Sequence, residues 1–222
     1  MNLLAFDTST ELISLAVMAK DKVVYRYSRR KKYGASSLIK YIKSALDKLG
    51  IALNEFDAFC VGAGPGSFTG LRISFSIAKA FSAALDKPVI SIGSFNNCAA
   101  QMGDRYKRIA VIADAKRNLI YGVSFRQRGG KIIREKKEML YSLNDFLRKH
   151  SGYTFCTYDG FLREKALLAD DSLDFYPKDV WPRADRLILL AKDYYLEKKF
   201  TPLEKLEPLY VYPKDCQIKK IK

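Results

Sequence analysis

Two aspartates, Asp7 and Asp114, are the acids of this chain whose placement suggests chemistry. Each ends an apolar strand pattern, and in both cases the next strand pattern begins five residues later, at Leu12 and Leu119. Paired aspartates of this kind can hold a metal–nucleotide complex such as Mg–ATP. The alternative is that each side chain caps its own turn. Because no phosphate-binding lysine motif accompanies them, we favour turn capping.

A glycine-rich stretch follows the apolar run 56–61 and precedes a long apolar segment. Such a loop at the start of a helix can cradle an anion, because backbone N–H groups point into it. A phosphate-binding P-loop also needs a lysine after its last glycine, and a dinucleotide fingerprint would need glycine at Ser67. Both matches fail, so we expect the loop to shape a turn and start a helix. Its residues are Gly64, Pro65, Gly66, Ser67, Phe68, Thr69, Gly70 and Arg72.

Other catalytic patterns are weak in the sequence. The single histidine, His150, lies in a segment flanked by lysine and serine, without the neighbouring nucleophile that hydrolase chemistry needs. No group of His, Cys and acidic residues shows the spacing of a zinc site. The four cysteines are widely separated, which together with the lack of a signal-peptide pattern at the N-terminus predicts reduced thiols and a cytoplasmic protein.

The elements that carry these residues repeat along the chain. Strand patterns at 3–7, 12–18 and 23–27 form one strand–Asp–strand–strand unit, and a similar unit occupies 109–114, 119–125 and 131–139. A repeat of this kind predicts a duplicated α/β fold with two lobes. Helix patterns at 38–49 and 186–198 have one apolar face each, and Ser37 and Gly50 are expected to bound the first of them.

The helix pattern at 73–85 is apolar nearly all round. Ile73, Ile77 and Ala80 lie on one face, Phe75 and Ala78 lie on another, and the only charge is Lys79. A helix of this kind must be covered on more than one side. It therefore lies deep in the core, or its second face packs on another subunit.

The chain is strongly basic, with 39 Lys and Arg against 24 Asp and Glu and a formal net charge of +15. The densest cluster is Arg26, Arg29, Arg30, Lys31 and Lys32. An ordinary lysine-rich surface or a surface that attracts RNA would each explain this charge. No apolar run is long enough for a membrane helix, so no membrane partner is expected.

Four motifs, in order, resemble the TsaB (YeaZ) family over essentially the whole chain. They are LAFDTST at 4–10, GPGSFTGLR at 64–72, IADAKR at 112–117 with Tyr121, and PLY at 208–210. The resemblance implies an ASKHA (actin-like ATPase) fold, with two RNase-H-like lobes that have mixed central sheets. We expect the lobes to span residues 1–104 and 105–222.

The same resemblance implies a non-catalytic role in the N6-threonylcarbamoyladenosine modification of tRNA. Such proteins bind and activate the transferase TsaD in a complex with the ATPase TsaE, and they often pair with themselves when isolated. Contact with tRNA is expected, if at all, through the complex. The family has also carried a glycoprotease-like peptidase label, for which this sequence supplies no chemistry.

The catalytic relative TsaD carries two metal-binding histidines four residues apart, whose positions here resemble Ser94 and Cys98. We therefore expect no cofactor in this chain, with Mg–ATP and metal on the partner subunits. Asp7, Thr8 and Asp114 are expected to mark a vestigial nucleotide cleft. An ASKHA-fold kinase or ATPase that uses Asp7 and Asp114 with Mg–ATP is the alternative, and a direct tRNA-binding module is another.

The partner surface is expected on the two helix patterns of the first lobe. This hypothesis follows from the second apolar face of 73–85, and it predicts that polar replacement of Phe75 or Ala78 weakens TsaD binding without unfolding the chain. The residues expected in the interface are Leu38, Ile42, Phe75, Ala78, Lys79 and Ser82.

Overall fold

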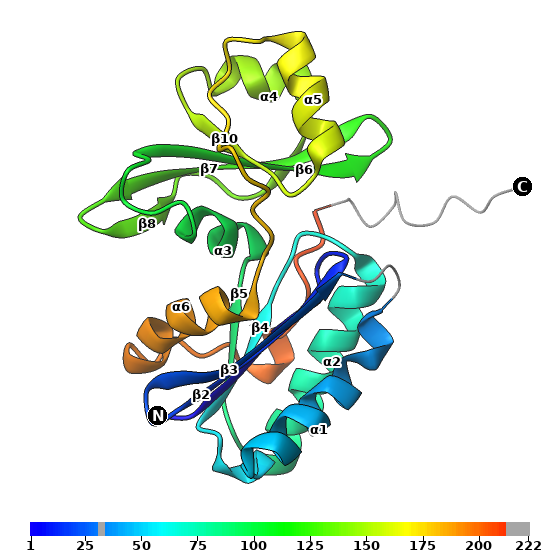
Figure 1. Cartoon of the computed structure of the whole chain (residues 1–222), viewed down its shortest axis with the longest axis vertical. Helices are drawn as coiled ribbons and strands as arrows, with labels where there is room; N and C mark the ends of the chain where they lie inside the picture. The colour runs from blue at the N-terminus through cyan, green and yellow to red at the C-terminus, as the bar shows by residue number, and fades with distance from the viewer. Residues whose placement is uncertain (31–33, 212–222) are drawn as a thin grey trace, which may run out of the picture. The chain divides into compact units, whose positions relative to one another are not determined.

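Apolar strands in the first hundred residues form a five-stranded mixed sheet in the order β3-β2-β1-β4-β5 (Figure 1). β1 is antiparallel to β2 and parallel to β4, and β4 is parallel to β5. The computed structural model describes residues 1–30 and 34–211. The strands span Leu3–Asp7 (β1), Leu12–Ala19 (β2), Lys22–Arg30 (β3), Ala58–Gly62 (β4) and Val89–Ile92 (β5).

Two helices, α1 (Leu38–Leu49) and α2 (Phe68–Leu85), cover one face of this first sheet. Their inward side chains join Leu4, Phe6 and Phe59 in one buried core. α1 begins and ends where the sequence predicts, with Gly50 at its C-cap in the left-handed region (φ 62°). Ser37 stands at the N-cap, as expected, but its side chain makes no capping hydrogen bond.

The other face of the first sheet is covered by α6 (Ala184–Leu196), which comes from far along the chain. Leu187, Ile188 and Ala191 are fully buried against β1, β2, β4 and β5. After α6, Thr201 bridges to Val89 on β5, and Leu206 reaches the core on the α1–α2 face. The C-terminal segment therefore packs on both faces of the first sheet.

A second mixed sheet has the order β10-β6-β7-β8, with β9 also paired to β7. β6 is antiparallel to β7 and parallel to β10, as β1 is to β2 and β4. The predicted strand–Asp–strand–strand repeat is confirmed by this matching topology. The elements span Arg108–Lys116 (β6), Leu119–Arg128 (β7), Lys131–Arg134 (β8), Met139–Ser142 (β9), Thr154–Cys156 (β10), Leu143–Lys149 (α4) and Gly160–Ala169 (α5).

Three hairpins of the repeat use two-residue turns in which both residues have positive φ. The turns are Lys20–Asp21 between β2 and β3, Arg117–Asn118 between β6 and β7, and Gly129–Gly130 between β7 and β8. Turns with this backbone match the right-handed twist of the strands on either side. The short connections fix the register of each hairpin.

The predicted division at residue 104 needs correction. One compact unit comprises 1–97 and 182–208, and the other comprises 98–181 and the end of the described chain after Pro208. The segment 182–208 belongs with the first unit because α6 supplies the apolar layer that one face of the first sheet requires. The bounded elements that remain are α3 (Ser94–Ala100) and three short 3₁₀ turns, at Ala35–Ser37, Leu53–Glu55 and Leu203–Lys205.

Some sequence predictions fall outside the described residues. Lys31 and Lys32 of the basic cluster do so, as do Cys216 and the end of the closing segment after Val211. Within the described ranges, no helix combines the length and the hydropathy that a membrane crossing requires.

Candidate functional site

Asp7 lies at the end of β1 and is completely buried. Its Oδ1 accepts hydrogen bonds from the Ser9 backbone N–H at 2.8 Å and from the Ser9 hydroxyl at 2.6 Å. Its Oδ2 accepts a hydrogen bond from Ser94 Oγ at 2.9 Å, and Ser94 Oγ accepts one from the Gly64 backbone N–H at 3.1 Å. Burial raises the pKa of the Asp7 carboxyl, although these hydrogen bonds act in the opposite direction. Asp7 thus joins three segments of the first unit.

The glycine-rich loop packs directly against the turn that follows Asp7. A Cβ on Gly62 would lie 1.8 Å from Asp7 Oδ2, and a Cβ on Gly70 would lie 2.0 Å from the Thr8 carbonyl oxygen. Contacts this short exclude any side chain, so glycine is required at both positions for close approach of the two segments. The loop is therefore shaped to receive a neighbouring turn of the same chain.

Hydrogen bonds fasten this contact on both sides. Thr8 Oγ1 donates to the Gly70 carbonyl at 2.7 Å, and the Ser67 N–H donates to the Ser9 carbonyl at 2.6 Å. Ser67 also caps α2, since its Oγ accepts from the Gly70 N–H at 3.2 Å. This cap explains why α2 begins at Phe68, five residues before the start of the predicted helix. The loop turns and starts a helix, as the sequence predicts.

The outer side of the loop carries exposed side chains. Phe68 is 48% exposed, and the Arg72 guanidinium lies 5.2 Å from the centroid of its ring. Ser67 and Thr69 are also exposed, and the peptide bond between Gly64 and Pro65 is cis. These family-motif residues lie together at the start of α2.

Asp114 lies in the second unit, near the end of β6, and it is exposed. Its Oδ1 accepts from the Lys116 backbone N–H at 2.8 Å, and its Oδ2 pairs with Lys116 Nζ at 2.5 Å. Partial burial pushes the pKa of Asp114 up, but the Lys116 bonds together lower it below the usual value. Both aspartates therefore bond within their own turns, which agrees with the turn-capping interpretation, and Asp7 additionally binds Ser94.

The two positions that resemble the metal histidines of TsaD make ordinary structural contacts. Ser94 bonds Asp7 as described above, and Cys98 Sγ donates to the Val180 carbonyl at 3.2 Å. Over residues 1–30 and 34–211, no group of three or more His, Cys, Asp or Glu side chains could hold a metal ion. His150 follows α4, where its Nδ1 lies 2.9 Å from the Phe146 carbonyl and its ring packs on Phe146 and Tyr153.

The predicted partner interface on the helices needs correction. Phe75, Ala78 and Ser82 on α2 are at most 5% exposed, and they face the core together with Leu38 and Ile42 on α1. The Ser82 hydroxyl also donates to the Lys87 carbonyl at 2.5 Å. Of the six predicted residues, only Lys79 is exposed. The face of α2 that was predicted to contact the partner is therefore the face that packs in the core.

The outward face of α2 is the row that contains Ile73 and Ala80. Ala80 and Ala84 are exposed and Ile73 is partly exposed, while Ile77 is partly exposed and also packs against the core. On α1, Ile39 is 49% exposed. This row, defined as Ile73, Ile77, Ala80 and Ala84, is called the α2 outer row below.

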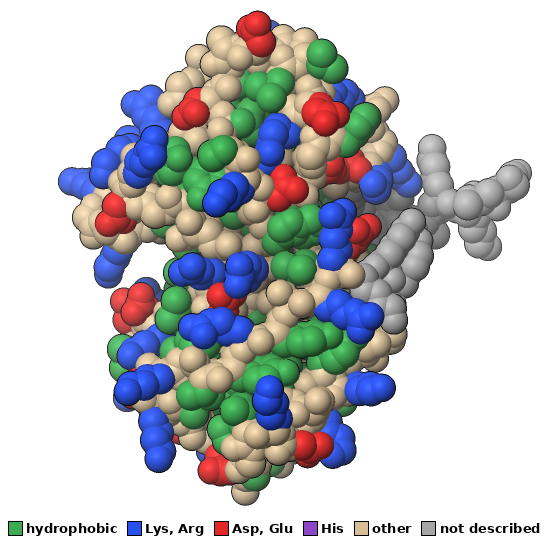
Figure 2. All heavy atoms as spheres, viewed as in Figure 1, with side chains coloured by type: hydrophobic (Ala, Val, Ile, Leu, Met, Phe, Trp, Pro, Cys, Tyr) green, Lys and Arg blue, Asp and Glu red, His purple; other side chains and the backbone are tan. Residues whose placement is uncertain are grey.

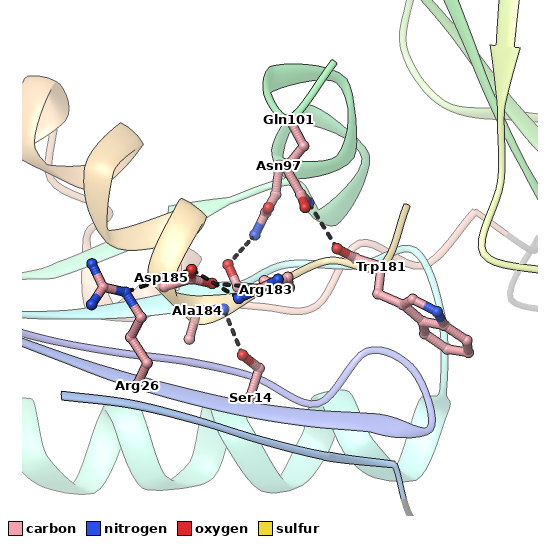
Figure 3. A network of polar contacts seen from close by, with 8 residues as sticks. All are labelled: Ser14, Arg26, Asn97, Gln101, Trp181, Arg183, Ala184 and Asp185. Carbon is pink, nitrogen blue, oxygen red and sulfur yellow. Dashed lines mark hydrogen bonds and ion pairs between the residues drawn. The ribbon is translucent and has the colours of Figure 1, made fainter. Parts of the chain in front are cut away.

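Sequence reasoning also missed the contacts that fix the start of α6 (Figure 3). Ser14 Oγ on β2 accepts a hydrogen bond from the Ala184 backbone N–H at 2.7 Å, and it is buried. Asp185 in the first turn pairs with Arg183 at 2.9 Å and with Arg26 on β3 at 3.8 Å. Asn97 Nδ2 donates to the Arg183 carbonyl at 2.8 Å. Only the position of Ser14 in an otherwise apolar strand pattern hinted at this role.

Comparison with known proteins decides the family. A family model described as TsaD, tRNA N6-adenosine threonylcarbamoyltransferase, matches residues 30–160, which is more than half of the chain. The tRNA threonylcarbamoyladenosine biosynthesis protein TsaB of Buchnera aphidicola subsp. Schizaphis graminum is 32% identical over 84% of this chain and 90% of its own length. The chain belongs to the TsaB (YeaZ) family. The TsaB of Haemophilus influenzae is 27% identical over 95% of this chain and 93% of its own length.

Solved structures show the fold. YeaZ from Pseudomonas aeruginosa superposes with a TM-score of 0.78 at 22% identity, over 94% of this chain and 99% of that one. A second Pseudomonas aeruginosa structure, described as similar to peptidase YEAZ, superposes with a TM-score of 0.81 at 22% identity, over 95% and 99%. With the two mixed sheets described above, the ASKHA-type fold predicted from the TsaB resemblance is confirmed.

Proposed function

We propose that this chain is a non-catalytic subunit required for the N6-threonylcarbamoyladenosine modification of tRNA, and that it binds and activates a TsaD transferase in a complex with TsaE. The observation that carries the proposal is the match to TsaB proteins, which covers most of this chain and most of each relative's length. The TsaD family model also covers residues 30–160, so this chain and the transferase share an architecture. Two related folds of this kind can pair through equivalent surfaces.

The chemistry of the described residues favours a supporting role over catalysis. Asp7 has no exposed surface and its carboxylate is occupied by Ser9 and Ser94. Asp114 is held by Lys116. We propose that the chain needs no cofactor of its own and acts in the cytoplasm, and that Mg–ATP and any metal bind to partner subunits. Calorimetric titration tests this directly, because saturable Mg–ATP binding with hydrolysis by the isolated chain would instead favour the kinase or ATPase alternative.

We place the TsaD contact on the α2 outer row, together with the exposed Ile39 of α1. Exposed alanines let a partner helix approach closely, and the partly exposed Ile73 and the half-exposed Ile39 can bury further apolar surface. Ile77 packs partly against the core, but Phe75 and Ala78 fill the core-facing side of α2, which leaves Ala80 and Ala84 exposed. The same row is where we expect the isolated chain to pair with itself.

The test is co-purification with TsaD for the variant Ala80→Glu. A charge in the centre of an apolar contact should weaken binding by about tenfold or more, with the chain still folded because Ala80 is exposed. The matched control is Ala169→Glu, an exposed alanine on α5 of the other unit. Phe75→Glu is unsuitable, because it would place a charge in the core. If Ala80→Glu binds TsaD as tightly as the control does, the proposed surface is wrong.

The function itself is tested by a tRNA modification assay with TsaD and TsaE, in the presence and absence of this chain. We expect modification only when the chain is present. Size measurement of the isolated chain by light scattering completes the test, and Ala80→Glu should lower the fraction of homodimer. Full modification without the chain would refute the proposed role.

A further inference from the structure

The second sheet carries an unusual concentration of cations at the end where β8 pairs with β7. Arg108 on β6 lies directly opposite Arg126 on β7, and Arg128 on β7 lies directly opposite Lys131 on β8. Directly opposite residues point to the same face of a sheet, as do residues two apart along a strand. Arg126 and Arg128 are two residues apart on β7, so the register places all four side chains on one face, and all four are exposed. We call these four residues the basic face.

Like charges directly opposite each other destabilise a pair of strands. The basic face contains two such pairs, Arg108 with Arg126 and Arg128 with Lys131. The topologically equivalent strands of the first unit contain none among their described residues, because Arg26 is opposite Ala16, Arg29 is opposite Ile13 and Arg30 is opposite Leu12. The repeated architecture therefore does not require this arrangement. An anion bound across the strands would relieve the repulsion.

The acidic neighbour of the basic face is already neutralised. Glu135 pairs with Arg126 at 2.9 Å and accepts a hydrogen bond from Tyr153 Oη at 2.8 Å. With Glu135 included, the cluster keeps a formal charge of +3, from four cations and one acid. In Figure 2, Lys and Arg side chains gather over the end of this unit where β8 lies in Figure 1. The excess of positive charge is therefore present in this cluster as well as in the chain as a whole.

An aromatic ring lies within the same cluster. The Arg108 guanidinium is 5.8 Å from the centroid of the Tyr153 ring, and Ile133, directly opposite Arg126, is 50% exposed. Cations on neighbouring strands lie about 5 Å apart and those two residues apart lie about 7 Å apart, which suits several phosphates of one backbone. Guanidinium groups, which hydrogen-bond phosphate through two N–H groups, make up three of the four cations.

We propose that the basic face binds the phosphate backbone of a folded RNA. The choice of tRNA as that RNA rests on the proposed function. Phosphate contacts of this kind fix position without reading sequence, so the face would hold a tRNA body while another subunit acts on it. An anionic membrane surface could also attract four cations, and it is distinguished by the experiment.

The experiment measures tRNA binding by the isolated full-length chain, by fluorescence anisotropy over a range of salt concentrations. The variant is Arg128→Glu with Lys131→Glu, and the control is Lys22→Glu with Lys178→Glu, which changes the total charge equally at exposed sites elsewhere. We expect the first variant to bind tRNA about tenfold or more weakly and with a shallower salt dependence, by about one unit of slope for each phosphate interaction that the substitutions remove. The control should bind within about twofold of the wild type, because it leaves the basic face unchanged.

Each outcome decides the matter. Equal weakening in the two variants would show that only bulk charge matters, and absence of tRNA binding by the wild type would also overturn the proposal. Vesicles with phosphatidylserine should not compete with tRNA; if they compete at equal lipid-phosphate concentration, the surface is a membrane site. If the double glutamate variant unfolds, Arg128→Gln with Lys131→Gln gives the same comparison.

TsaD co-purification of the same variants separates this proposal from the proposed function. We expect TsaD binding to be unchanged by substitutions on the basic face. If the wild type fails to bind TsaD but still binds tRNA through the basic face, the proposed function falls and this inference stands. If the wild type binds TsaD but does not bind tRNA through the basic face, the proposed function stands and only this inference falls.

Discussion

Among the individual residues, Asp7 is better explained as a structural junction than as a ligand for a metal–nucleotide complex. Its carboxylate is buried and joins its own turn, through Ser9, to Ser94 at the start of α3. Gly62 is the neighbour that makes room for it. A buried carboxylate of this kind is tolerated only when hydrogen bonds replace its water. Substitution can test both the space beside Asp7 and its charge.

The substitution Gly62→Ala should destabilise the first unit by about 1–3 kcal/mol, because the new methyl group would overlap Asp7 Oδ2. Urea unfolding measures the change. Gly160→Ala is the control, since its added Cβ meets nothing within 4 Å. A Gly62→Ala chain as stable as the control would show that the Asp7 site can relax.

The substitution Asp7→Asn should change how stability depends on pH. Burial raises the pKa of the Asp7 carboxyl in the folded state, so ionisation disfavours folding, and wild-type stability falls as pH rises from about 4, the unfolded value, through the folded pKa. Asn cannot ionise. The stability of Asp7→Asn relative to wild type should therefore improve as pH rises through that window, as measured by urea unfolding at a series of pH values. A stability difference that does not change with pH, or that changes in the opposite direction, would contradict a raised pKa for Asp7.

Among the helices and strands, the position of α6 depends on one polar contact at its start. Ser14 Oγ satisfies the Ala184 N–H, a group that no intrahelical bond can satisfy. Arg26 and Arg183 hold Asp185 in the same turn. The rest of α6 is held by apolar packing of Leu187 and Ile188, each of which contributes about 1.5–3 kcal/mol when buried.

The substitution Ser14→Ala should cost about 1–3 kcal/mol, because it leaves the Ala184 N–H buried without an acceptor. Hydrogen exchange should show faster opening of the first turn of α6, ahead of the strands. Ser44→Ala, at an exposed position of α1, serves as the control and should be nearly neutral. Unchanged exchange at the start of α6 would count against the anchoring role of Ser14.

In the molecule as a whole, the first unit is assembled from two separate parts of the chain. Residues 1–97 supply the sheet with α1 and α2, and residues 182–208 supply α6 and the segment that pairs with β5. A sheet with one bare apolar face is not stable in water. The unit therefore needs both parts of the sequence.

A fragment of residues 1–104, the lobe predicted from sequence, should lack a cooperative unfolding transition, because Leu3, Ala5 and Ile90 would no longer be covered by α6. Linking residues 182–208 to its C-terminus through a flexible linker should restore the transition. Circular dichroism with urea denaturation checks both chains. Cooperative unfolding of the short fragment, at a stability like that of the linked chain, would contradict this account of the unit.

Sequence patterns were sufficient to predict the repeated hairpins, the loop that starts α2 and the family. These features are local, because a strand pattern, a two-residue turn or a glycine motif is read within a few neighbouring residues. The sequence also places Asp7 at the end of β1 and Asp114 near the end of the equivalent strand β6, for the same reason.

The buried face of α2 and the place of residues 182–208 could be found only in the folded chain. The periodicity of α2 shows two apolar faces, but it does not show which of them the sheet covers. In the folded chain the face with Phe75 and Ala78 is buried, and the face with Ala80 and Ala84 is exposed. The Ser94 bond to Asp7 and the Ala184 bond to Ser14 join residues 87 and 170 positions apart. Contacts at such separation leave no local pattern, because they arise only when folding brings the two segments together.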